Sequence, residues 1–198
     1  MKRFSSLATF FLVILISTSV FASGVGLTGI GARATALGGN FRGVANDWSA
    51  IYWNPAGLTQ IKGMHFGFST EAIMPVGEYT FSQNSLMPFS VYRTEAVENE
   101  PATFVIPAAG FVYGFEKMSF GLGIYVPFGL GSEWDVMNTE AYNPEYASID
   151  YEDDLKVIAI QPTFAYQVSE KLSVGLGAII TYTDIIIRKP TTTPNPMI

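Results

Sequence analysis

The chain has 198 residues, of which 11 are basic and 17 are acidic, and 48% are hydrophobic, with a mean hydropathy of +0.27. That hydropathy is high for a soluble domain, and the net charge of −6 argues against binding nucleic acid by phosphate neutralisation. The absence of cysteine excludes a disulfide framework and a thiolate metal site.

The first residues have the order of features of a secretory signal peptide. Lys2 and Arg3 precede an apolar run at 7–16, and compact residues follow at 20–22. A membrane anchor needs roughly 20 apolar residues to cross about 30 Å of hydrocarbon, and this run is shorter. We therefore expect residues 1–22 to be a cleaved signal peptide, which leaves nine basic residues against 17 acidic ones and a net charge of −8.

Residues 23–61 are rich in glycine and alanine and lack the alternation of a strand. Small residues allow close packing and tight turns, which suits a segment folded inside a narrow lumen. Residues 46–49 are suited to cap a short helix, and Asn54 followed by Pro55 would end it. The glycines lack the spacing of a phosphate-binding loop.

From residue 62 onward, apolar residues alternate with small or polar ones over stretches close to ten residues long. Such segments are typical of transmembrane β-strands, in which one face meets lipid and the other faces the barrel interior. Beyond the signal peptide no apolar run is long enough for a transmembrane helix, and a membrane protein without such helices must pair its backbone groups in a barrel. The predicted strands cover 64–72, 103–115, 118–126, 158–168 and 171–183.

The side expected to face lipid is rich in large apolar residues, including Met64, Phe66, Phe68, Met118, Phe120, Leu122, Ile124, Ile158, Ile160, Phe164, Leu172, Val174 and Leu176. Pro162 is awkward within its strand because proline cannot donate to a ladder. Strand 103–115 has apolar residues on both faces, which predicts a partly apolar lumen.

The predicted connections alternate in length. Turns at 115–118 and 168–171 are short, whereas 75–100 and 128–154 read as long acidic loops, and this asymmetry is typical of outer-membrane barrels. We interpret the acidic residues as a solvated surface; the alternative, bound Ca²⁺ or cations that bridge lipopolysaccharide, lacks supporting ligand spacing.

A secreted β-sandwich is the soluble alternative, but its strands are usually about five or six residues long. Five strands cannot close a membrane barrel, since bacterial single-chain barrels begin at about eight. We therefore expect an all-β, antiparallel transmembrane barrel that is incomplete in this chain, with its first strands at 62–198.

Residues 23–61 contain three short motifs: Gly-Ile-Gly-Ala-Arg-Ala at 29–34, Ala-Asn-Asp at 45–47, and Asn54-Pro55-Ala56. Together they resemble the N-terminal hatch of the FadL/TodX outer-membrane transporters. The similarity continues through 101–127 and 155–185. It implies a 14-stranded monomeric barrel, plugged by a hatch at 23–61, in the outer membrane of a Gram-negative cell.

The resemblance also implies passive transport of long-chain fatty acids or other hydrophobic small molecules, with outer-membrane lipid as the other partner and no cofactor or metal. A fatty acid gains about 0.8 kcal/mol for each methylene removed from water, so its conduit should be partly apolar. The candidate lining residues are Phe104, Ile106, Val112 and Ile179, which could instead pack against the hatch. Arg188 or Lys189 is the candidate partner for a substrate carboxylate.

An alternative resemblance involves Tyr52-Trp53 and Gly57-Leu58, which are similar to PorV-type barrels of the type IX secretion system. An enzyme is not expected, because His65 is the only histidine and has no evident acid partner. We interpret His65 as a hydrogen-bonded residue of the lumen.

Overall fold

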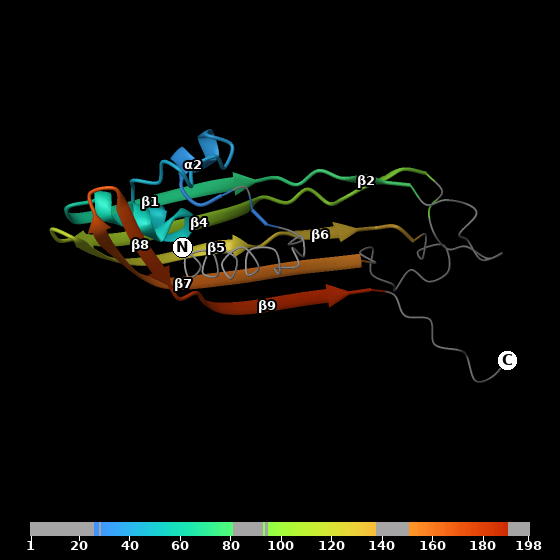
Figure 1. The fold of residues 1–198 in the computed structure, drawn as a ribbon. Helices are drawn as coiled ribbons and strands as arrows, with labels where there is room; N and C mark the ends of the chain where they lie inside the picture. The colour runs from blue at the N-terminus through green and yellow to red at the C-terminus, as the bar shows by residue number, and fades with distance from the viewer. Residues whose placement is uncertain (1–25, 28, 81–92, 94, 138–150, 190–198) are drawn as a thin grey trace, which may run out of the picture.

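The computed structural model describes residues 26–27, 29–80, 93, 95–137 and 151–189, so the expected signal peptide at 1–22 lies outside the described residues. These residues form an elongated seven-stranded antiparallel sheet and a separate two-stranded sheet, with short helices near one end of the larger sheet (Figure 1). The predicted all-β class is confirmed. The strands of the main sheet are β1 (Gly63–Ile73), β4 (Phe104–Gly114), β5 (Met118–Phe128), β6 (Gly131–Trp134), β7 (Tyr151–Ser169), β8 (Leu172–Gly177) and β9 (Ile180–Arg188).

The main sheet is a meander of five long arms. β6 continues β5 along one edge of β7, and β9 continues β8 along the other. Two further short strands, β2 (Glu78–Tyr79) and β3 (Val97–Glu98), pair with each other and prolong the hairpin of β1 and β4. The expectation of about five strands is therefore confirmed.

The gap between β8 and β9 has a local cause in Pro162. Ala178 lies opposite this proline and donates its N–H to the Pro162 carbonyl oxygen at 3.1 Å. Proline has no N–H with which to donate the reciprocal hydrogen bond, so one bond of the ladder is missing. The register is the same on both sides of the gap, and the predicted strand at 171–183 is thus one arm with a single weak rung.

Two predicted boundaries were wrong at the end of the sheet away from the helices. β7 begins at Tyr151, not near residue 158, and β6 lies inside the stretch predicted as a loop. The acidic run Glu152–Asp154 pairs with β6 on one side and β9 on the other. Strand pairing continues here although the apolar alternation has ended. At about 3.3 Å per residue, the 19 residues of β7 extend about 60 Å, further than the 9–11 residues that cross a bilayer.

The two faces of the sheet differ as the alternation predicts. Outward residues are large, apolar and exposed, for example Phe66 at 75% and Leu176 at 77%. Most inward residues of the central strands are small or polar and buried, such as Ala159 and Ser119, both at 0%, while Ile106 and Val112 of β4 are inward and apolar. Outward aromatic rings follow one another near the short turns: Tyr113 and Phe115 lie 4.6 Å apart, and Phe120 and Phe164 lie 5.0 Å apart between centroids.

The N-terminal segment, residues 29–61, lies against the inner face near the short turns. It contains helices α2 (Ala32–Ala36) and α3 (Ala50–Trp53) and the 3-10 helix η1 (Pro55–Gln60). None of the helices within the described residues is long and apolar enough to cross a membrane.

Local features of the sequence mark where these helices begin and end. After α2, Gly38 has a φ of +62° and donates to Thr35 O, while Gly39 donates to Ala34 O, the pairing of a Schellman motif. Before α3, Asp47 Oδ1 accepts the Ser49 N–H at 2.9 Å, whereas Ser49, the N-cap residue, makes no side-chain capping bond to the helix. α3 stops at Asn54, which is extended because a proline follows.

Candidate functional site

Glycines on the inner face of the sheet receive an indole ring of the N-terminal segment. A Cβ added at Gly67 of β1 would lie 1.8 Å from Trp48 Cδ1, and one at Gly110 of β4 would lie 2.5 Å from Trp48 Cε3. No side chain fits at such distances. The absence of side chains at these two positions therefore creates the recess that Trp48 fills.

The same arrangement recurs along the next strands. A Cβ at Gly121 of β5 would lie 2.8 Å from Ile51 Cγ1, and one at Gly175 of β8 would lie 2.5 Å from the carbonyl carbon of Pro55. Ile51 is itself 1% exposed. Contacts of this kind cover the wall from β1 to β8, so the segment matches the shape of the sheet over most of its width.

Side-chain hydrogen bonds between described residues also link the N-terminal segment to the wall. Gln161 of β7 donates from Nε2 to the Ile51 carbonyl oxygen at 2.8 Å, and its Oε1 accepts the hydroxyl proton of Tyr125. Thr59 donates to Ser173 Oγ at 2.9 Å. Thr35 donates to Glu71 at 2.6 Å. The Gln161 bonds are buried, and buried polar groups are costly to leave unpaired.

The Asn54-Pro55-Ala56 motif forms the bend between α3 and η1. Asn54 donates from Nδ2 to Arg42 O at 3.0 Å, and its own carbonyl oxygen accepts the Gly57 N–H at 2.8 Å. Pro55 begins η1, where its missing N–H costs nothing. Pro55 and Ala56 then lie on Gly175, so the motif both turns the segment and rests on the wall.

A cavity of about 500 Å³ lies at the other end of the sheet, away from the helices. Its lining combines aromatic rings with two carboxylates and consists of Glu78, Tyr79, Trp134, Val136, Tyr151 and Asp153. Trp134 is oriented by a bond from Nε1 to Ser132 Oγ at 2.9 Å. These residues were not predicted as a site, because they lie in stretches predicted as loops; the aromatic residues among the acidic ones were the available signal.

Comparison with known proteins bears on this arrangement. Residues 13–195 match the family described as outer membrane protein transport protein (OMPP1/FadL/TodX). The chain belongs to this family. A protein of Neisseria meningitidis serogroup B that is named as an outer membrane protein is 30% identical over 125 residues, which are 60% of this chain and 26% of the relative. The chain thus spans about a quarter of the length of that curated relative. No solved structure matches the chain.

Of the four lining residues predicted for this member of the FadL/TodX family, three lie on the inner side of β4 and the fourth lies between β8 and β9. Val112 is fully buried and belongs to the core formed with the N-terminal segment. Ile106 is 8% exposed and Phe104 is half-buried, both on the inner side of β4. Ile179 lies in the gap between β8 and β9 and is 58% exposed.

The two predicted carboxylate partners lie at the end of β9. Arg188 Nη1 already forms an ion pair with Glu152 Oε2 at 2.6 Å. Lys189 follows the strand and is exposed. Any substrate carboxylate would compete with Glu152 for Arg188.

The histidine and the carboxylates of the described residues are possible metal ligands by residue type. His65 Nε2 hydrogen-bonds the Lys62 carbonyl oxygen at 3.0 Å near the start of β1. The described residues contain no group of three histidine, aspartate or glutamate side chains placed to hold a metal ion.

Proposed function

We propose that the complete protein carries hydrophobic small molecules passively across the outer membrane, with long-chain fatty acids and aromatic hydrocarbons as the expected classes. The observation that carries this proposal is the division of the inner face into two zones. One zone is closed by the N-terminal segment, and the other keeps an aromatic cavity. Membership of the outer membrane protein transport protein family supports it.

In this proposal the N-terminal segment is a hatch. It is held by shape and by a few hydrogen bonds, each worth about 0.5–1.5 kcal/mol net. Its contacts with the wall through Trp48 and Ile51 are apolar and non-directional. A segment held in this way can shift by small steps without breaking a covalent or metal link.

The aromatic cavity is the proposed entry zone. Trp134 and Tyr151 offer apolar surface, and burying a methylene there releases about 0.8 kcal/mol. From this cavity a substrate would pass Phe104 and Ile106 on the inner side of β4 before it reaches the hatch. We also propose that residues 1–22 are removed during export.

A binding experiment tests the function directly. Full-length protein, reconstituted in detergent, should bind oleate or toluene-like compounds saturably, because the entry zone has a finite aromatic surface. If the amount of bound ligand rises linearly with ligand concentration for both classes and does not saturate, the proposal is contradicted.

An uptake experiment tests the hatch. Asn54→Ala removes the bond to Arg42 O and should slow uptake while the amount of protein in the outer membrane stays unchanged. Gln60→Ala is the matched control, since Gln60 is an exposed amide on η1. Equal uptake by wild type and Asn54→Ala would remove the role assigned to Asn54.

A further inference from the structure

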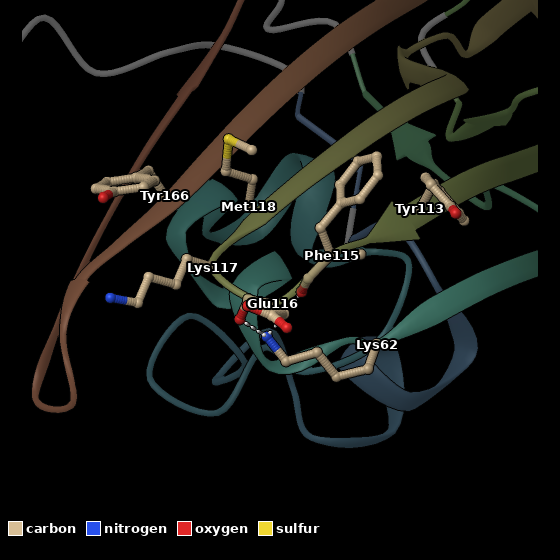
Figure 2. A pocket seen from close by; sticks show the side chains of 8 residues that line it. Lys62, Tyr113, Phe115, Glu116, Lys117, Met118 and Tyr166 are labelled. Atoms are coloured by element: carbon tan, nitrogen blue, oxygen red, sulfur yellow. Dashed lines mark hydrogen bonds between the residues drawn. The ribbon is translucent and has the colours of Figure 1, made fainter.

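A shallow pocket of about 710 Å³ lies beside the short turn between β4 and β5. Figure 2 shows its lining, in which aromatic and aliphatic side chains lie on one side of the turn and charged ones on the other. The lining residues are Lys62, Tyr113, Gly114, Phe115, Glu116, Lys117, Met118 and Tyr166.

The apolar part of this pocket belongs to the outward face of the sheet. Met118 pairs with Tyr166 across β5 and β7, and both side chains are outward and about 40% exposed. Tyr113 and Phe115 meet edge to face at 4.6 Å. Aromatic rings at the end of an outward apolar band mark the level of lipid headgroups, and short turns mark the periplasmic side. The pocket therefore faces the periplasmic leaflet.

Two ammonium groups border the aromatic rings. Lys62 donates from Nζ to Phe115 O at 3.2 Å and to Glu116 O at 2.8 Å, which leaves one of its three N–H groups for another acceptor. Lys117 is exposed and extends from the turn on the side of Tyr166 (Figure 2). Glu116 is the one acidic residue of the lining, so the lining carries a net charge of +1.

This charge contrasts with the rest of the chain. The described residues of 75–100 and 128–156, at the opposite end of the sheet, include nine acidic residues and two basic ones, Arg93 and Lys156. An anion near the protein is therefore repelled at one end and attracted at the lysines of the other.

We propose that this pocket binds the phosphate headgroup of an anionic glycerophospholipid in the periplasmic leaflet. Lys117 contacts the phosphate, since a lysine ammonium binds phosphate as a point charge, and Lys62, held at the turn, adds positive charge nearby. The acyl chains lie along Phe115, Met118 and Tyr166. The inference uses the outer-membrane orientation of the proposed function but not its substrate, so lipid binding without substrate uptake would leave it intact.

The test compares lipid retention by single-charge variants. Full-length protein is reconstituted in vesicles of phosphatidylglycerol and phosphatidylethanolamine, extracted in mild detergent, and examined by native mass spectrometry. Lys117→Gln should lower the retained phosphatidylglycerol relative to phosphatidylethanolamine about fivefold, the effect of losing one lysine near an anionic surface. Glu116→Gln should raise it, and Lys117→Arg should preserve it.

Lys189→Gln is the matched control, because Lys189 is an exposed lysine at the far end of the sheet. The proposal is overturned if Lys117→Gln retains as much phosphatidylglycerol as wild type. It is also overturned if Lys189→Gln loses as much as Lys117→Gln does, since that result means a general charge effect.

Discussion

Gly67 offers the sharpest test of how the N-terminal segment meets the sheet. In Gly67→Ala, the new Cβ would lie 1.8 Å from Cδ1 and 2.1 Å from Nε1 of Trp48, well inside any permitted contact. The ring is also confined by Gly110, where a Cβ would lie 2.5 Å from Trp48 Cε3. Trp48 must therefore move out of its recess. Overpacking of this kind costs about 1–3 kcal/mol of the free energy of unfolding.

The measurement is urea unfolding of the full-length protein in detergent, followed by far-UV circular dichroism. Gly43→Ala is the matched control, because a Cβ there meets nothing within 4 Å. Removing the ring should remove the clash, so Gly67→Ala should cost little in a Trp48→Ala background. The double-mutant cycle should then report a coupling of about 1–3 kcal/mol.

Two results would refute this reasoning. Equal midpoints for Gly67→Ala and Gly43→Ala would mean that Trp48 does not occupy the recess. If Gly67→Ala lowers the free energy of unfolding as much in the Trp48→Ala background as in wild type, Gly67 matters for the strand itself and not for its contact with the N-terminal segment.

Two further predictions concern polar contacts. Gln161→Leu should destabilise the protein by about 1–3 kcal/mol, since it leaves Ile51 O and the Tyr125 hydroxyl without their buried partner; urea unfolding measures the change, and a stability equal to wild type would show that these groups find other partners. Glu152→Gln should change stability by less than about 1 kcal/mol, because Arg188 is 73% exposed, yet it should tighten oleate binding by releasing that guanidinium. Unchanged oleate affinity in a fluorescence titration would count against Arg188 as the carboxylate partner.

The strands could be read from the sequence wherever one face meets lipid. The predicted strands at 64–72 and 118–126 differ from β1 and β5 by at most two residues at either end, because outward Phe, Leu and Ile alternate there with Gly and Ser. Apolar alternation did not predict the strands where the sheet continues beyond the outward apolar residues. Asp153 and Asp154 lie in a strand although their neighbours show no apolar alternation, since pairing with β6 and β9 satisfies their backbone groups.

The site was only partly predictable. The position of Asn54 before Pro55 predicts the end of α3, because that restriction acts between neighbouring residues. The sequence did not decide whether Val112 packs against the N-terminal segment, since an apolar residue on the inner face could equally line a conduit. The cavity around Trp134 was missed, because its members come from three segments far apart in the sequence.

The sequence by itself determined the class of fold, since hydrophobic alternation with period two is a property of each strand alone. The same alternation placed the glycines of the strands on the inner face. The richness in small residues predicted a compact N-terminal segment with tight turns. Only the tertiary structure decided how the two fit. The recess at Gly67 and Gly110 spans two strands, and the residue that fills it, Trp48, comes from a third part of the chain. Such a fit depends on distances between groups that no local pattern records.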